Sequence, residues 1–145
     1  MRIKIETLVN GNYKQVSARF DEELFLALKP PLVQLDLKVF DGCEKGDRVE
    51  MELGILGVKQ AWKSLITEHG ISNDKSYFVD EGIVLPPPLK SWKHHHILEN
   101  VGDTRTKIVD DIQFSTGFSL LDYLIYPVMY LQFWYRKPIY KRYFQ

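Results

Sequence analysis

Short turns between extended segments constrain the fold of this chain more than any other feature of its sequence. Between residues 32 and 115 the sequence contains six strand-like segments that are separated by Gly-, Asp- or Pro-containing turns. Neighbouring strands joined by such turns pair antiparallel, because a parallel pair needs a crossover of about a dozen residues or more. The six strands are expected at residues 32–40, 48–56, 59–67, 76–84, 89–101 and 104–115.

The N-terminal segments add one strand and two short helices. Residues 2–9 alternate between apolar and polar side chains and are predicted to form a seventh strand. Short helices are expected at residues 13–20 and 22–28, with Asp21 as the N-cap of the second helix. The prolines that follow Lys29 end this helical pair.

A helix is predicted from about Ser119 to near the end of the chain, with a kink at Pro127. Helical spacing places an aliphatic stripe on one side, which is expected to face the sheet; it comprises Leu120, Leu124, Val128, Leu131 and Tyr135, flanked by Leu121. The opposite arc is rich in aromatic residues and comprises Asp122, Tyr123, Tyr126, Tyr130, Phe133, Trp134 and Lys137. A single helix cannot fill the concave side of a twisted seven-stranded sheet, so a cavity between helix and sheet is expected.

The composition supports one folded domain over residues 1–145. The chain is 45% hydrophobic, which excludes disorder, and its 19 basic and 19 acidic residues give no net charge, which argues against nucleic acid as a partner. The single cysteine, Cys43, excludes an intrachain disulfide and favours a reducing compartment. Residues 1–6 lack the apolar core of a signal peptide, and residues 120–135 are too short for a membrane span. The expected location is cytoplasmic.

Several local motifs resemble those of the START-like, or SRPBCC, superfamily. They are Trp62-x-Ser64-x-Ile66, Phe78-Val79-Asp80, Trp92-x-His94-x-His96 and Thr106-x-Ile108-x-Asp110-x-Ile112-x-Phe114. The resemblance covers essentially the whole chain and is closest to ligand-binding members similar to polyketide cyclases. It implies an α+β helix-grip fold, in which a seven-stranded curved antiparallel sheet wraps a long C-terminal helix.

Strand alternation independently predicts a polar cluster on the concave face. Trp92, His94 and His96 share one face of their strand, whereas His95 points outward. The neighbouring strands should add Asp80 and Asp110 to the same side. Such a cluster could be a satisfied polar network that orients a ligand, a His–Asp pair that moves protons, or a metal site. The first interpretation is preferred, and no metal or cofactor is assigned.

These patterns favour a pocket protein that binds a small hydrophobic or amphipathic molecule, such as a lipid, an isoprenoid or an aromatic polyketide. The residues expected to contact the ligand are Trp62, Phe78, Asp80, Trp92, His94, His96, Ile108, Asp110, Ile112, Leu121 and Leu124. One alternative is a cyclase- or dehydratase-type enzyme, whose candidate catalytic residues are His94, His96, Asp80 and Asp110.

The other alternative is a module that binds a membrane or a partner through the aromatic side of the last helix. A peripheral membrane contact, and a monomer or a homodimer, fit this pattern. Whether any reaction is catalysed stays open, and a non-catalytic role is preferred.

Overall fold

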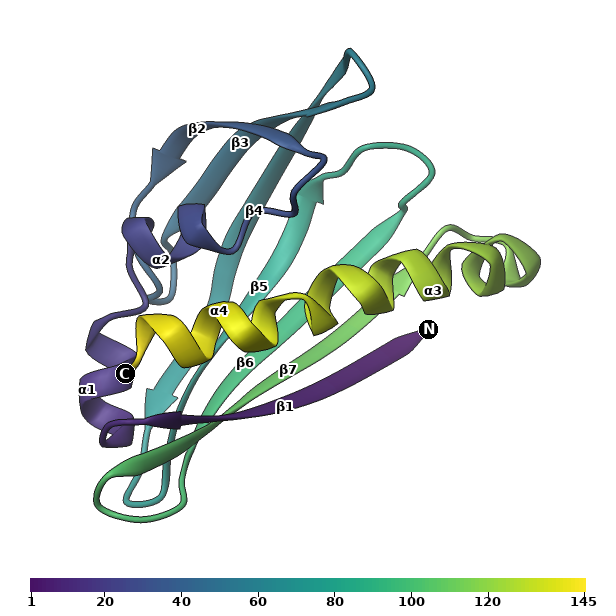
Figure 1. Ribbon diagram of the computed structural model, residues 1–145. Coiled ribbons are helices and arrows are strands. Elements are labelled where there is room, and N and C mark those ends of the chain that lie inside the picture. The colour runs from purple at the N-terminus through teal and green to yellow at the C-terminus, as the bar shows by residue number, and fades with distance from the viewer.

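Seven strands form one antiparallel sheet in the order β1-β7-β6-β5-β4-β3-β2 (Figure 1). The structure is a computed structural model that describes residues 1–145. Its elements are β1 Arg2–Asn10, α1 Tyr13–Ala18, α2 Glu22–Ala27, β2 Gln34–Phe40, β3 Arg48–Ile55, β4 Val58–Ile71, β5 Lys75–Val84, β6 Ser91–Asn100, β7 Arg105–Ser115, α3 Ser119–Trp134 and α4 Arg136–Tyr143. The predicted α+β helix-grip architecture, its seven strands and their antiparallel pairing are therefore confirmed.

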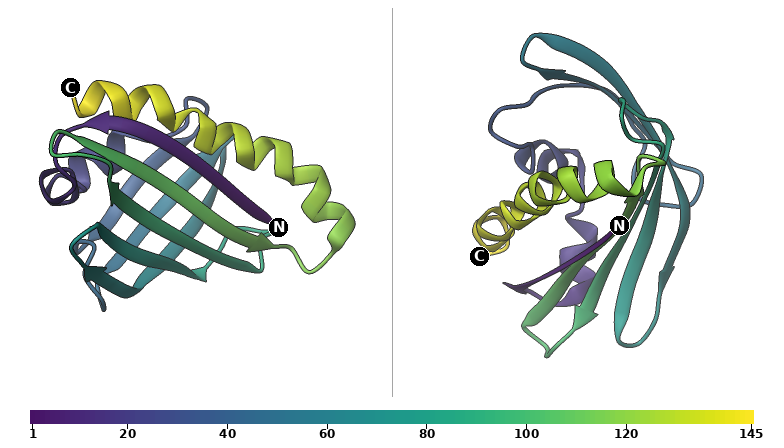
Figure 2. Two further views of the ribbon diagram at one scale, coloured as in Figure 1. Left: turned by 90° about the horizontal axis from the view of Figure 1, so that it is seen from below. Right: turned by 90° about the vertical axis from the view of Figure 1, so that its right-hand side faces the viewer.

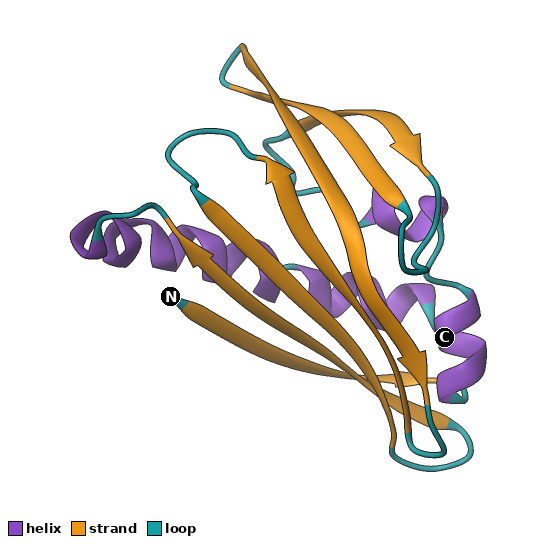
Figure 3. Cartoon of the chain, turned by 180° about the vertical axis from the view of Figure 1, so that it is seen from behind, coloured by secondary structure: helices purple, strands orange, loops and turns teal.

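The sheet curves around the C-terminal helices (Figure 2). Register shifts between Leu37 and Val39 in β2, and at two places in β4, interrupt the regular pairing. Such bulges bend a strand and increase its twist. Beyond its second shift β4 still pairs with β5, which is why it extends to Ile71 and not only to residue 67. Seen from behind, the helices all lie beyond the sheet, on its concave side (Figure 3).

The two short helices close one end of the concave face. The Asn12 side chain accepts a hydrogen bond from the Lys14 amide at 2.9 Å and begins α1. Asp21 caps α2 as predicted, because its Oδ1 accepts a hydrogen bond from the Leu24 amide at 2.9 Å. Val16 of α1 and Leu24 of α2 are both 1% exposed. They belong to a core cluster that also contains residues of β1, β6, β7 and α4.

The C-terminal helix is turned differently from the prediction. The aliphatic stripe that was expected to face the sheet is exposed to solvent, with Leu120 at 74% and Leu131 at 61%. Phe133, which was assigned to the outer arc, is 5% exposed and packs with Trp92 and Phe114. The helix has apolar side chains all round, so helical periodicity could not select its buried side.

A buried carboxylate lies on the side of α3 that faces the sheet. Asp122 is 8% exposed, and its Oδ1 accepts hydrogen bonds from the Thr116 amide and from Thr116 Oγ1, both at 2.7 Å. These bonds lower the pKa of Asp122. An unpaired buried carboxylate would be costly, so the pairing with Thr116 stabilises this orientation, as does the packing of Phe133 on Trp92.

The predicted single helix is divided at Tyr135, between α3 and α4. Pro138 accounts for the division, because a proline has no amide hydrogen to donate to the carbonyl four residues earlier, here that of Trp134. Tyr135 itself keeps helical angles, with φ −58° and ψ −26°, so the chain continues in nearly the same direction (Figure 1). Pro127 lies inside α3 and does not end it. None of the helices is long and apolar enough to span a bilayer.

Candidate functional site

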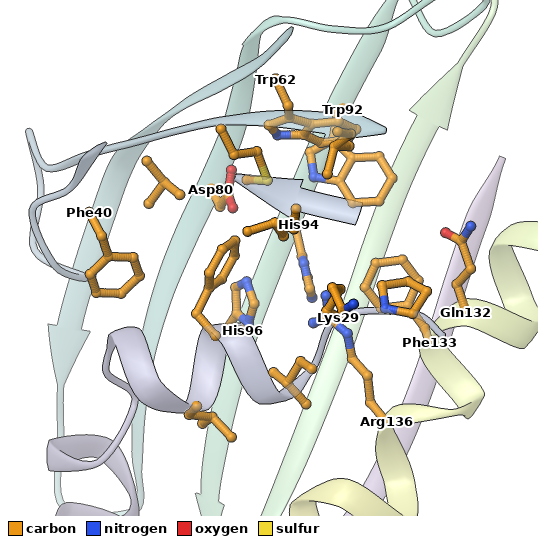
Figure 4. Close-up of a pocket in the computed structure, with 18 of the residues that line it drawn as sticks. Lys29, Phe40, Trp62, Asp80, Trp92, His94, His96, Gln132, Phe133 and Arg136 are labelled. Carbon is orange, nitrogen blue, oxygen red and sulfur yellow. The ribbon is translucent and has the colours of Figure 1, made fainter. Parts of the chain in front are cut away.

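A cavity of about 260 Å³ lies between the sheet and the helices (Figure 4). It is lined by 29 residues, of which 19 are hydrophobic, so its wall is mainly apolar. Strands β2 to β6 form one side, and the other side comes from α2, the segment after it, the last turns of α3 and the start of α4. A few polar groups project into this apolar space, which is the usual construction of a site for a small molecule.

Six of the residues predicted to contact a ligand line the cavity. Aromatic groups of the wall come from three strands: Trp62 from β4, Phe78 from β5 and Trp92 from β6. The two indole rings meet edge to face, with centroids 5.0 Å apart. Asp80, His94 and His96 also line the cavity.

Five other predicted residues do not line it. Ile108, Asp110 and Ile112 point to the concave side as predicted, but each is 0–1% exposed. They lie on β7, and the C-terminal helices pack over β1 and β7 rather than over the middle of the sheet. The helix rotation leaves Leu124 at 65% exposure, and Leu121 is likewise absent from the wall. The cavity is therefore displaced toward β2 and α2.

The displacement brings in residues that the sequence reasoning did not select. The apolar additions come from α2, the segment after it, β3 and β4, and include Leu24, Leu28, Val33, Val49, Met51, Leu53 and Ile66. Alternation along β3 carried a signal for three of them, since Val49, Met51 and Leu53 share one face. The polar additions include Lys29, Gln132 and Arg136. Their positions depend on how the helices dock, so no local sequence pattern marks them.

Three members of the predicted polar cluster meet at the cavity wall, with Asp110 buried behind the two histidines. His94 Nε2 lies 2.8 Å from Asp110 Oδ1, and His96 Nδ1 lies 3.7 Å from the same oxygen. The Tyr140 hydroxyl donates to Asp110 Oδ1 at 3.4 Å. The two imidazole rings stack with centroids 3.5 Å apart, and Phe78 stacks on His96 at 4.2 Å. Phe78 on one side and Phe133 on the other therefore pack against the two imidazole rings.

Burial determines the charge of this cluster. It lowers the pKa of His94 and of His96 well below the ordinary value, and it raises the pKa of Asp110. Both imidazoles are therefore neutral at neutral pH. A neutral His94 donates from Nε2 to the Asp110 carboxylate, whereas His96 Nδ1 has no hydrogen-bond partner.

Asp80 stands apart from the other three. It faces His94 across the β5–β6 pairing, but Asp80 Oδ1 is buried without a hydrogen-bond partner. Burial raises its pKa to about 6, against the opposing effects of the nearby Ser64 hydroxyl and the Arg136 charge. Because the pKa is raised from its ordinary value of 3.8, the free energy of unfolding falls as the pH rises from 3.8 to about 6; the cost of burying Asp80 is complete above this range and absent below it.

The cluster fits a hydrogen-bonded network better than a cation site. His94, His96 and Asp110 do offer three ligand atoms within 4.8 Å of one another, a set that transition metals use. However, His94 Nε2 is already bonded to Asp110, and the positive charge of Arg136 opposes protonation of both histidines. The same charge would repel a divalent ion. We assign no metal to these residues.

Cys43 also lines the cavity but is not a nucleophile. Burial, together with the nearby Asp80, Asp47 and Asp21 carboxylates, raises the pKa of its thiol to about 12. Its Sγ donates to the Phe20 carbonyl at 3.4 Å. The thiolate needed for attack is therefore not formed at neutral pH.

Solved structures share the fold of this chain at low sequence identity. The aromatase/cyclase Zhui from Streptomyces sp. R1128 superposes with a TM-score of 0.62 and 13% identity over 82% of this chain and 70% of its own. Truncated norcoclaurine synthase from Thalictrum flavum superposes with a TM-score of 0.67 and 10% identity, over 88% of this chain and 82% of its own. The di-domain ARO/CYC protein BexL of the BE-7585A biosynthetic pathway has a TM-score of 0.62 and 16% identity, over 94% of this chain and 45% of its own.

Sequence comparison adds nothing to this likeness, since no protein-family model and no curated protein matches the chain. The elements of this chain that make up the shared fold are the antiparallel sheet, the two short helices after the first strand and the C-terminal helices. The protein has an SRPBCC-type helix-grip fold, similar to that of polyketide aromatase/cyclases and norcoclaurine synthase.

Proposed function

We propose that this protein binds a small hydrophobic or amphipathic molecule in the cavity between the sheet and the C-terminal helices. The observation that carries the proposal is the apolar cavity itself, with Trp62, Trp92 and Phe78 in its wall. A volume of about 260 Å³ is close to the lower end of ligand pockets, roughly 300 Å³. It suits a single acyl or isoprenoid chain, or a few fused aromatic rings, better than a lipid with two chains.

Binding of a neutral, environment-sensitive dye such as N-phenyl-1-naphthylamine tests the proposal. The dye should fluoresce on mixing with the protein and should be displaced by single-chain or polycyclic apolar compounds. Leu53→Trp should weaken dye binding at least about tenfold, because the larger side chain occupies the cavity that Leu53 lines, while leaving the chain folded. Leu56→Trp is the matched control, since Leu56 is 97% exposed. Equal dye binding by both variants would contradict the assignment of the cavity as the binding site.

A second candidate is a cyclase- or dehydratase-type enzyme. The observation that favours it is the presence of proton-transfer groups in and behind the wall: the His94–Asp110 pair and Asp80, whose pKa of about 6 suits a general acid. Two of the solved structures that share this fold, an aromatase/cyclase and norcoclaurine synthase, are named for cyclisation and synthase reactions, which supports the same reaction class. Mass spectrometry of ligand recovered from the binding assay distinguishes the candidates, because a carrier returns its ligand unchanged and an enzyme converts it.

A further inference from the structure

Arg136 places a positive charge in the helix-side wall of a mainly apolar cavity. It is the first residue of α4, and Figure 4 shows its side chain reaching from that helix toward His94. The guanidinium carbon lies 4.4 Å from the centre of the Phe133 ring, which holds it against the wall. The side chain is half-buried, so its position is set by packing rather than by solvent.

No carboxylate pairs with this guanidinium. Arg2 and Arg48 both form ion pairs with acidic side chains, at 2.7 Å to Asp111 and at 3.5 Å to Asp41. None of the ion pairs of the chain includes Arg136. The Arg136 charge acts on Asp80 and Asp110, but neither carboxylate lies within ion-pair distance of the guanidinium. An anionic ligand in direct contact would therefore stabilise this half-buried charge further.

The other charged and titratable groups of the wall determine which end of the cavity attracts an anion. His94 and His96 are neutral, and Lys29 is exposed at the edge of the cavity. Two acidic residues line the cavity: Asp21 is exposed and caps α2, and Asp80 comes from β5. Arg136 comes from α4 (Figure 4). An anion is therefore attracted to the α4 end of the cavity and repelled from the β5 wall.

We propose that the ligand carries one oxyanion, a carboxylate or a phosphate, that Arg136 binds through its guanidinium while the apolar part fills the aromatic cavity. This inference rests on the proposed function and narrows its ligands to amphipathic acids. Guanidinium groups suit both oxyanions, because their paired donors match carboxylate and phosphate oxygens.

Competition by three ligands of equal chain length tests the inference. Dodecanoate, dodecyl phosphate and dodecanol are titrated against the bound neutral dye. At least one of the two anions should displace the dye at a concentration about tenfold or more below that needed for dodecanol, and the better anion identifies the oxyanion. Arg136→Met should weaken the binding of that anion by about 10–100-fold, as expected for hydrogen bonds to a charged group. The affinity for dodecanol should not change.

The controls separate this inference from the proposed function. Arg136→Lys should keep part of the preference for the anion, and Lys29→Met should change it little because Lys29 is exposed. If all three ligands compete equally, or if Arg136→Met leaves the preference intact, the anion site is wrong although the cavity still binds ligands. If neither the dye nor any of the ligands binds, the proposed function itself fails.

A separate observation concerns the outer face of α3. We use this name for the solvent-exposed side chains Leu120, Tyr123, Leu124, Val128, Tyr130, Leu131, Trp134 and Tyr135, which are between 37% and 74% exposed. From Tyr123 to Tyr135 the helix has no charged residue. The first turns of α3 also project beyond the ends of the strands in two views (Figures 1 and 2). An apolar face of this extent is typical of a contact surface.

The charges near this face are basic. After Asp122 the chain holds four basic residues and no acidic one. Tyr135 keeps helical angles, so α4 continues the direction of α3. At about 3.6 residues per turn, Arg142 comes about five full turns after Leu124 and therefore lies on the same side of the helix. Both Lys141 and Arg142 are exposed. Tyrosine and tryptophan between an apolar stripe and basic side chains match the boundary between lipid headgroups and acyl chains.

We infer that the outer face of α3 rests on an anionic lipid surface. Vesicle flotation tests this, with vesicles of phosphatidylcholine alone and with about 30% phosphatidylglycerol. The protein should float with the anionic vesicles and much less with the neutral ones, because basic residues near such a surface strengthen binding several-fold each. Leu124→Ser with Leu131→Ser should abolish flotation, and Lys141→Glu with Arg142→Glu should weaken it about tenfold or more.

Leu56→Ser with Val58→Ser is the matched control, because these apolar side chains are also exposed, at 97% and 57%, but lie at the β3–β4 hairpin. That pair should float like the unaltered protein. A failure to bind anionic vesicles would overturn the inference. So would a dimer, seen by light scattering, that the Leu124 and Leu131 substitutions dissociate, since a second copy of the chain would then be what covers this face.

Discussion

Asp110→Ala is expected to lower the free energy of unfolding by about 3–5 kcal/mol, the usual cost of removing one member of a buried polar pair. Asp110 is 1% exposed and accepts hydrogen bonds from His94 Nε2 at 2.8 Å and from the Tyr140 hydroxyl at 3.4 Å. The substitution leaves both donors buried without an acceptor. Urea unfolding at neutral pH measures the change as a lower midpoint at an unchanged slope.

Two further variants test whether the cost comes from the pairing. Asp110→Asn keeps an oxygen that can accept from His94, so it should destabilise the protein less than alanine does. Combining Asp110→Ala with His94→Leu should cost less than the sum of the single changes, because the double variant no longer leaves His94 Nε2 unpaired. Strict additivity would show that the 2.8 Å contact contributes nothing to stability.

Phe133→Ala is expected to lower the free energy of unfolding by about 3–5 kcal/mol, whereas Leu131→Ala should change it by no more than about 0.5 kcal/mol. Phe133 is 5% exposed and contacts the Trp92 and His94 rings, with centroids at 5.7 and 5.2 Å. Leu131 lies two residues earlier and is 61% exposed. Truncating Phe133 creates a void in the core, whereas truncating Leu131 removes only surface that water already reaches.

Thermal or urea unfolding of the two variants side by side measures this contrast. The opposite result, with Leu131→Ala as the damaging change, would mean that α3 is rotated to the orientation that its aliphatic stripe suggested. It would also remove the outer face of α3 as a contact surface, because that face would then be core.

Local sequence patterns were sufficient for the strands and for the face that each presents. The alternation of Trp92, His94 and His96 correctly assigned them to the concave side, because successive side chains of a strand point to opposite faces whatever the rest of the chain does. Short turns correctly implied antiparallel neighbours, and Asp21 was recognisable as a helix cap. These features depend on residues close together in the chain.

The position of the cavity depended on tertiary structure alone. Ile108 and Ile112 have the predicted orientation, yet they lie in the core because the C-terminal helices cover β7 and leave the β2–β6 side open. No periodic pattern could reveal the rotation of α3, since apolar side chains surround that helix and tertiary contacts select its inner face, among them the buried Asp122–Thr116 pair and the packing of Phe133 on Trp92.

The position of Arg136 in the cavity also depended on tertiary structure and not on local sequence. In the sequence it is one of several basic residues near the C-terminus, and nothing nearby distinguishes it from Lys137 or Arg142. In the structure it alone of these three lines the cavity. The sequence by itself determined which elements form and which faces are apolar, because those properties follow from local spacing. Which polar groups share the cavity was decided only by docking of the helices on the sheet, because it depends on contacts between residues far apart in the chain.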